Sequence, residues 1–186
     1  MELLDVIDEN NTLTGKAEER KIIHEKGLWH RQVSCWIMNQ KGELLFQKRA
    51  KTKKCNPNKW SKTGGHVDTK EEPVEGMIRE IKEEIGVDIP KEKIKLLSIK
   101  KYQKNYYKKD ILHRYYGYDY ITLVDYKIED YKIQKEELSE VKYITIEEME
   151  KIKQKNDENY TFVKWDNFDE IISMLKRERN NLKLNK

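Results

Sequence analysis

Three glutamates stand close together near the middle of the chain, at Glu80, Glu83 and Glu84. The spacing i, i+3, i+4 places them on one side of an α-helix that turns by ~100° per residue. Carboxylates this close repel one another unless a cation lies among them, and Mg²⁺ prefers such ligands together with substrate phosphates. Taken alone, three glutamates in a chain this rich in Glu and Lys are more often a solvated acidic face. The residues around them therefore decide between the two interpretations.

The helix that carries the glutamates is predicted over residues 73–85. Its apolar residues form a narrow stripe that must face a core, namely Val74, Ile78, Ile81 and Ile85. Gly86 is a typical helix end. Gly76 lies on the glutamate side, where a glycine costs about 1 kcal/mol relative to alanine. We therefore expect another group to approach the helix backbone at Gly76.

A longer pattern surrounds these residues. Gly65 is followed after five residues by Glu71, and after seven more by the run Arg79–Val87, with the sequence REIKEEIGV. This pattern resembles the Nudix signature at every fixed position. The resemblance implies an α/β/α sandwich with a mixed β-sheet and a loop-helix-loop catalytic motif, over about residues 28–150.

The resemblance also implies roles for single residues. The implied ligands of a divalent cation, usually Mg²⁺, are Glu80, Glu83, Glu84 and, through its backbone, Gly64. Arg79 resembles the residue that orients a neighbouring glutamate, and Glu71 resembles a mainly structural one. Mg²⁺ or Mn²⁺ is the expected cofactor, with more than one ion when substrate is bound.

A looser resemblance extends upstream, to the branch of Nudix proteins that includes isopentenyl-diphosphate isomerase and its hydrolase relatives. It rests on Trp29-His30-Arg31, Leu44–Arg49, Lys53, Pro57, Trp60 and Gly65-His66. The isomerase has a catalytic cysteine where this chain has Gly64, and neither Cys35 nor Cys55 aligns there. Isomerisation needs a positioned acid and base, so the missing thiol favours hydrolysis.

The isomerase also binds a metal through histidines and two glutamates. His24, His30 and His66 fall at or near those histidine positions, whereas His113 and Tyr115 stand where the glutamates would be. Packing or hydrogen-bonding roles are favoured over metal ligation for His24, His30 and His113.

Substrate contacts are expected from Arg49 and Lys53, which match basic residues that contact diphosphate in the isomerase relatives. A guanidinium and an ammonium suit a diphosphate, although a solvated basic loop would look the same. His66 directly follows Gly65 and is expected to reach the substrate. Glu137 resembles a glutamate that assists the metal or acts as general base.

Composition limits the other classes of function. The 38 basic and 34 acidic residues give a net charge of +4, which is too balanced for a dedicated nucleic-acid binder. The N-terminus lacks the pattern of an export signal, and no apolar run is long enough to span a bilayer. Two cysteines without metal-ligand spacing favour a reduced, cytoplasmic protein.

We expect one Nudix domain over residues 1–186, with an N-terminal arm or hairpin (1–27), a core (28–150) and a C-terminal helical extension (151–186). Strands are predicted at 33–38, 43–47, 94–99, 115–124 and 141–144, with a basic aromatic loop over 100–114. Helices are predicted at 146–152 and around the amphipathic stripe of residues 168–175, before a fraying tail over 180–186.

The expected function is Mg²⁺-dependent hydrolysis of a diphosphate linkage in a nucleoside di- or triphosphate or a nucleoside diphosphate linked to another group. One alternative is an isoprenoid diphosphate enzyme, either a hydrolase or a divergent isomerase. Another is a Nudix module that binds a nucleotide without cleaving it. A small-molecule partner is expected and DNA is not; RNA contact and a homodimer stay open.

Overall fold

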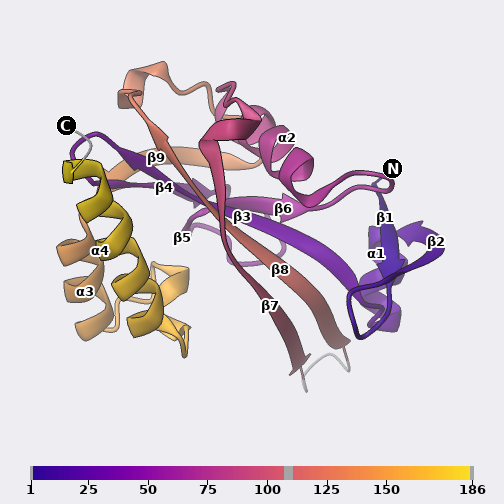
Figure 1. Cartoon of the computed structure of the whole chain (residues 1–186). Helices are drawn as coiled ribbons and strands as arrows, with labels where there is room; N and C mark the ends of the chain where they lie inside the picture. The colour runs from indigo at the N-terminus through magenta and orange to yellow at the C-terminus, as the bar shows by residue number, and fades with distance from the viewer. Residues whose placement is uncertain (1, 107–110, 185–186) are drawn as a thin grey trace. The chain divides into compact units, whose positions relative to one another are not determined.

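The computed structural model describes residues 2–106 and 111–184. The strands in this part of the chain are β1 (Leu3–Ile7), β2 (Leu13–Glu19), β3 (His30–Asn39), β4 (Leu44–Arg49), β5 (Trp60–Ser61), β6 (Thr63–His66), β7 (Ile94–Tyr106), β8 (Ile111–Val124) and β9 (Leu138–Ile144). The α-helices are α1 (Arg20–Lys26), α2 (Pro73–Ile85), α3 (Ile146–Gln154) and α4 (Phe168–Leu184) (Figure 1). The chain therefore has the mixed α/β composition that the sequence predicts.

The strands form two sheets. β1 and β2 make a two-stranded sheet, and the larger sheet has seven strands in the order β5-β4-β3-β8-β7, with β6 also paired to β3 and β9 to β4. The chain divides into two compact units. The first unit contains Met1–Cys35, Gly64–Lys82 and Asp88–Ile121, and the second contains Trp36–Thr63, Glu83–Val87 and Thr122–Lys186.

The first unit begins with the antiparallel hairpin β1–β2, in which Leu3 pairs with Glu19. This confirms the hairpin predicted within residues 1–27. The sequence analysis missed α1, which follows β2 directly and ends at Gly27, a residue with φ of 61°. A left-handed residue at this place is a common helix end, and glycine adopts it without strain.

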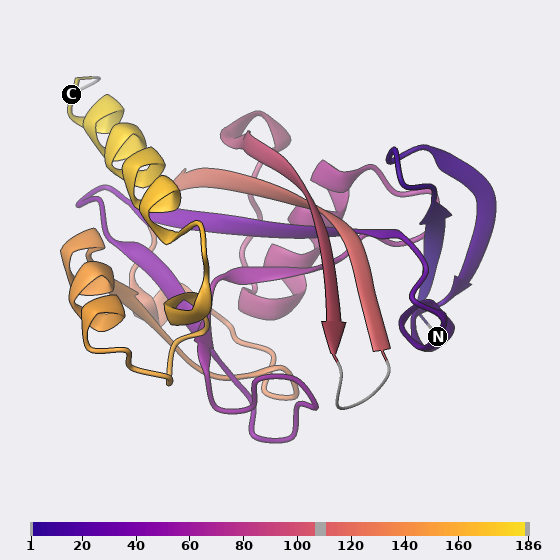
Figure 2. The ribbon, with the colours of Figure 1, turned by 90° about the horizontal axis from the view of Figure 1, so that it is seen from below.

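The first unit also contains β7 and the part of its long neighbour β8 up to Ile121 (Figure 2). The prediction of a loop over 100–114 is wrong where these strands are described, and residues 107–110 lie outside the described part. Backbone pairing needs no apolar side chains on a solvated face, so a Lys-rich segment can still be a strand. Tyr102 of β7 stacks on Tyr115 of β8 with ring centroids 4.8 Å apart, a cross-strand contact that supports the pairing.

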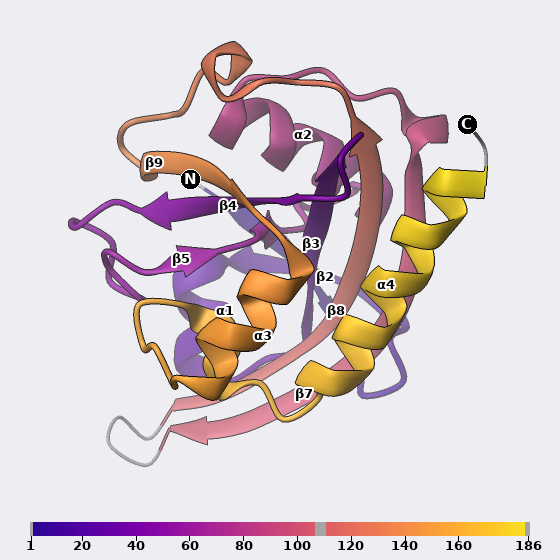
Figure 3. The same ribbon diagram turned by 90° about the vertical axis from the view of Figure 1, so that its left-hand side faces the viewer.

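The second unit is built around β4, which pairs antiparallel with β5 and β9 (Figure 3). The predicted hairpin is confirmed by the pairing of Met38 with Leu44. Aromatic rings fill the core, with Phe46 and Phe162 at a centroid distance of 5.5 Å. Helix α4 continues to Leu184 and so includes residues 180–184 of the predicted tail, while residues 185–186 lie outside the described part.

Among the described residues, none of the helices combines the length and apolar character needed to cross a membrane.

Candidate active site

Helix α2 has the predicted bounds, and its predicted apolar side is confirmed in part. Ile81 and Ile85 are fully buried, but Val74 and Ile78 are only half-buried and the unpredicted Met77 is fully buried beside them. Gly86 follows the helix with φ of 73°. The glutamates differ in exposure: Glu83 is exposed, Glu80 is half-buried and Glu84 is only 5% exposed. A solvated acidic face would leave all three in water, so the burial of Glu84 argues against that interpretation.

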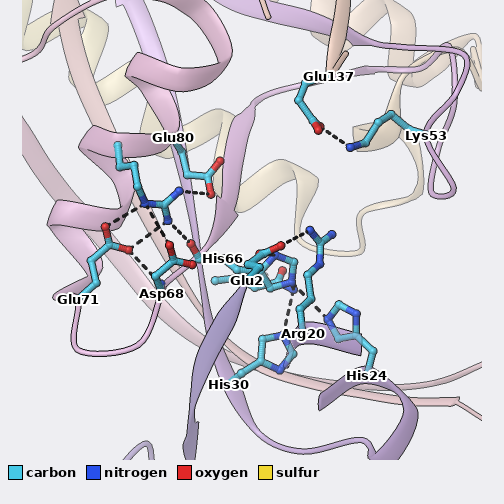
Figure 4. A network of polar contacts seen from close by, with 12 residues as sticks. Glu2, Arg20, His24, His30, Lys53, His66, Asp68, Glu71, Glu80 and Glu137 are labelled. Carbon is cyan, nitrogen blue, oxygen red and sulfur yellow. Dashed lines mark hydrogen bonds and ion pairs between the residues drawn. The ribbon is translucent and has the colours of Figure 1, made fainter. Parts of the chain in front are cut away.

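Arg79 connects the carboxylates of Glu71 and Glu80 in the first unit, and Figure 4 shows how these two glutamates lie. Its guanidinium donates two hydrogen bonds to Glu71, at 3.0 and 3.1 Å, and one to Glu80 Oε1 at 3.1 Å. A further bond of 2.9 Å reaches the backbone oxygen of His66. Although burial disfavours the charged form, the hydrogen bonds and charges of Glu71 and Glu80 outweigh it and raise the pKa of Arg79. Arg79 thus holds the Glu80 carboxylate, which fits the orienting role that the resemblance implied.

Two glycines make room for these carboxylates. A Cβ on Gly65 would collide with the carboxylate of Glu80, and a Cβ on Gly76 would lie 2.8 Å from Glu71 Oε2. The group expected to approach the helix at Gly76 is therefore the Glu71 side chain. Gly64 is required for another reason, because a Cβ there would collide with the backbone oxygen of Val33 in the neighbouring strand.

In the second unit, Glu84 accepts a hydrogen bond of 2.7 Å from Gln47 Nε2. Thr63 donates in turn to Gln47 Oε1 at 3.0 Å. Gln47 and Thr63 are each 1% exposed, so three polar side chains form a buried chain of hydrogen bonds. The sequence analysis missed Gln47 and Thr63, since neutral polar residues in strands give no distinctive signal.

The same unit brings Lys53 and Glu137 together as an ion pair between Nζ and Oε2 (Figure 4). The loop that carries Glu137 is hydrogen-bonded to the end of α2, where Gln134 N donates to the Glu84 backbone oxygen at 3.0 Å. Arg49, at the end of β4, donates from Nε to the backbone oxygen of Cys55 at 3.0 Å. Two of the predicted catalytic and substrate residues thus contact each other directly.

Histidines from three elements of the first unit converge in a cluster, which we call the histidine cluster: His24, His30 and His66. Their candidate ligand atoms all lie within 4.8 Å of one another, and His24 Nε2 is 3.3 Å from His66 Nε2. The ring of His113 lies 4.8 Å from that of His24, between centroids. The resemblance to the isomerase places these histidines near one site, in agreement with this convergence, although packing or hydrogen-bonding roles are favoured there over metal ligation for His24, His30 and His113.

The histidine cluster is uncharged at neutral pH. Burial, together with neighbouring positive groups, lowers the pKa of His24 to about 4, and burial chiefly lowers that of His30 to about 3. The pKa of His66 also falls well below its usual value, mainly through burial. Nδ1 of His30 donates to the backbone oxygen of Leu28 at 3.1 Å, and Nδ1 of His66 lies 3.3 Å from a Glu2 carboxylate oxygen. Both rings therefore present the lone pair of Nε2.

The comparison with known proteins agrees with this geometry. Residues 28–166 match the NUDIX domain model, and the chain belongs to the Nudix family. An uncharacterized Nudix hydrolase from Clostridium acetobutylicum is 35% identical over 153 residues, covering 80% of this chain and 72% of the relative. The structure of a MutT protein from Methanosarcina mazei superposes with a TM-score of 0.56 at 20% identity, over 82% of this chain and 95% of that one. The predicted fold class is confirmed.

The similarity to the isomerase is real but partial. Isopentenyl-diphosphate Delta-isomerase from Streptomyces avermitilis is 38% identical over 86 residues, which cover 46% of this chain and 44% of that enzyme. The upstream resemblance therefore extends over less than half of either chain.

Proposed function

We propose that the protein is a divalent-metal-dependent hydrolase that cleaves a diphosphate linkage in a small molecule by attack of water on phosphorus. The observation that carries this proposal is that other side chains hold two of the α2 carboxylates by hydrogen bonds. Glu80 is held by Arg79 and Glu84 by Gln47, so the protein fixes these carboxylates instead of leaving them in solvent. Membership of the Nudix family supplies the reaction class.

The residues present fit Mg²⁺ or Mn²⁺. Three carboxylates on one helix offer the hard oxygen ligands that these ions prefer, namely Glu80, Glu83 and Glu84. We propose the backbone of Gly64 as a further ligand. More than one ion is expected with substrate bound. The metal would neutralise the diphosphate and activate water.

The protein's own groups supply binding and proton transfer in this proposal. Arg49 and Lys53 bind the phosphates, and His66 is a further substrate contact. When a substrate phosphate binds the Lys53 ammonium group, the ion pair between Lys53 and Glu137 breaks. Its carboxylate is then available as a general base, beside the candidates Glu83 and Glu84.

Arg49→Ala and Lys53→Ala should each raise KM about tenfold, because a charge-assisted contact of about 1.5 kcal/mol is lost. Steady-state kinetics at saturating Mg²⁺ measure the change, with kcat falling much less than KM rises. Lys51→Ala is the matched control, since Lys51 is exposed in the same basic loop. If all three substitutions raise KM equally, the loop acts only through its total positive charge, and specific phosphate contacts by Arg49 and Lys53 are contradicted.

We also propose that the histidine cluster binds a transition metal such as Zn²⁺. Two nitrogens on a tetrahedral Zn²⁺ lie about 3.3 Å apart at usual bond lengths, which matches the 3.3 Å between His24 Nε2 and His66 Nε2. Gln32 Nε2 lies 3.2 Å from His30 Nε2 and 3.3 Å from His66 Nε2. A rotated Gln32 amide would offer an oxygen as fourth ligand.

The cluster should bind one equivalent of Co²⁺ or Zn²⁺, which an excess of Mg²⁺ does not displace, because imidazole nitrogen suits these metals and Mg²⁺ prefers oxygen. Equilibrium dialysis gives the stoichiometry, and visible absorption of Co²⁺ reports its geometry. His24→Ala should abolish this binding, whereas Glu84→Gln should retain it. Binding that survives His24→Ala would place the metal elsewhere.

A nucleotide-type diphosphate is the proposed substrate, and the partial isomerase similarity leaves isoprenoid diphosphates as the alternative. Release of phosphate or nucleotide should be screened over nucleotides, nucleotide sugars, dinucleotides and isoprenyl diphosphates, with Mg²⁺ and with Mn²⁺. A nucleotide-binding module would bind one of these compounds and leave it intact. We also propose a reducing, cytoplasmic setting, as expected for a chain with two cysteines, Cys35 and Cys55, that lack metal-ligand spacing.

A further inference from the structure

The hydrogen bonds around Glu84 have a defined direction. An ionised carboxylate only accepts, so Gln47 must turn its NH₂ group toward Glu84, as the 2.7 Å bond shows. The amide oxygen of Gln47 then faces Thr63, whose hydroxyl donates to it at 3.0 Å. A hydroxyl and an amide could each be turned the other way, but only this arrangement satisfies all three groups. Glu84 therefore sets the orientation of the Gln47 amide, and the Thr63 hydroxyl holds the amide in place by donating to its oxygen.

Because these three side chains are buried, the loss of any one hydrogen bond among them is costly. Gln47 and Thr63 are 1% exposed and Glu84 is 5% exposed, so water cannot easily replace a lost hydrogen bond. A buried carboxylate that loses its donor is destabilised in its charged form, which is the form that binds a cation. Partners of this kind fix the orientation of metal-ligating carboxylates, and their loss commonly reduces metal affinity or activity by about 10- to 100-fold.

We propose that Gln47, held in place by Thr63, is a positioning residue that keeps the Glu84 carboxylate ready for the catalytic divalent cation. This inference rests on the proposed function, since it assumes that Glu84 is a metal ligand. Gln47 lies on β4 and Thr63 on β6, so the strands determine how Glu84 presents its oxygens. The competing interpretation is that the three residues only stabilise the fold.

The two interpretations differ in the dependence on Mg²⁺. Gln47→Leu should raise the Mg²⁺ concentration for half-maximal hydrolysis about tenfold, while KM for substrate at saturating Mg²⁺ stays within about twofold of wild type. Thr63→Val removes only the hydroxyl and should shift the Mg²⁺ midpoint in the same direction. Thr63→Ser keeps the donor and should restore the wild-type midpoint. A purely structural role would lower thermal stability and maximal rate with an unchanged Mg²⁺ midpoint, and that result would overturn the proposal.

A direct binding measurement separates this proposal from the proposed function. Mn²⁺ binding is followed by EPR without substrate, and the signal of the Glu84→Gln protein is subtracted to remove binding at the histidine cluster. If wild type hydrolyses no diphosphate, yet the Mn²⁺ difference signal is present and weakened in Gln47→Leu, the positioning role stands and the proposed reaction fails. If wild type is active and Gln47→Leu binds Mn²⁺ normally, positioning alone fails. Absence of any difference between wild type and Glu84→Gln would remove Glu84 from the metal site and so overturn the positioning role, whether or not wild type is active.

Discussion

Glu84→Gln should lower kcat by about three orders of magnitude or more, because one neutral amide replaces a carboxylate that holds the metal, and the metal supplies much of the transition-state stabilisation. The fold should survive, since glutamine has nearly the same volume and its amide oxygen can accept the hydrogen bond from Gln47. Steady-state hydrolysis at saturating Mg²⁺, together with the melting temperature, provides the measurement.

Glu75→Gln is the matched control for this substitution. Glu75 lies in the first turn of the same helix and pairs with Lys91 at 3.4 Å on the surface. Its replacement should leave turnover within about twofold of wild type, because exposed ion pairs contribute little. Wild-type turnover in the Glu84→Gln protein would contradict the assignment of the site to α2.

Arg79→Ala should reduce kcat about 100-fold, the second-largest effect expected. Arg79 holds both Glu71 and Glu80, so its loss removes charge-assisted hydrogen bonds from two neighbouring carboxylates and lets Glu80 move. Loss of a residue that hydrogen-bonds to a metal ligand commonly has an effect of this size. Thermal unfolding should also show a loss of about 1 to 2 kcal/mol from the broken charge-assisted bonds.

Arg79→Lys tests whether the charge or the geometry matters. A single ammonium cannot donate in the fixed fork that bridges two carboxylates, so this variant should recover stability better than it recovers kcat. Lys82→Ala is the control on the same helix, where Lys82 makes an exposed pair with Asp88 at 2.7 Å. If Arg79→Lys restores full turnover, Arg79 acts only through its charge.

The helix at the centre of the site could be predicted closely from sequence. The apolar stripe with Ile81 and Ile85 and the glycine at 86 determined the bounds of α2 because helix periodicity and helix ends leave local signals. Strand β7 was underestimated because its lysines look like a loop, and its cross-strand contact of Tyr102 with Tyr115 on β8 depends on residues distant in sequence.

The sequence predicted the charged residues of the candidate site better than the groups that hold them. Arg79 and the glutamates belong to a recognisable spacing, whereas Gln47 and Thr63 become partners of Glu84 only when β4 and β6 are placed in the sheet. The histidine cluster is a similar case, because its members come from α1, β3 and β6. Convergence of this kind is a property of tertiary structure.

Hydrolysis in water labelled with ¹⁸O tests the central claim most directly. Wild type, incubated with Mg²⁺ and the best compound of the substrate screen, should release products in which one phosphoryl group carries a single ¹⁸O atom by mass spectrometry. Removal of Mg²⁺ with a chelator, or the Glu84→Gln substitution, should abolish that incorporation. Tight binding of the compound without ¹⁸O incorporation would contradict hydrolysis, and so would conversion of isopentenyl diphosphate into dimethylallyl diphosphate as the only reaction detected by NMR.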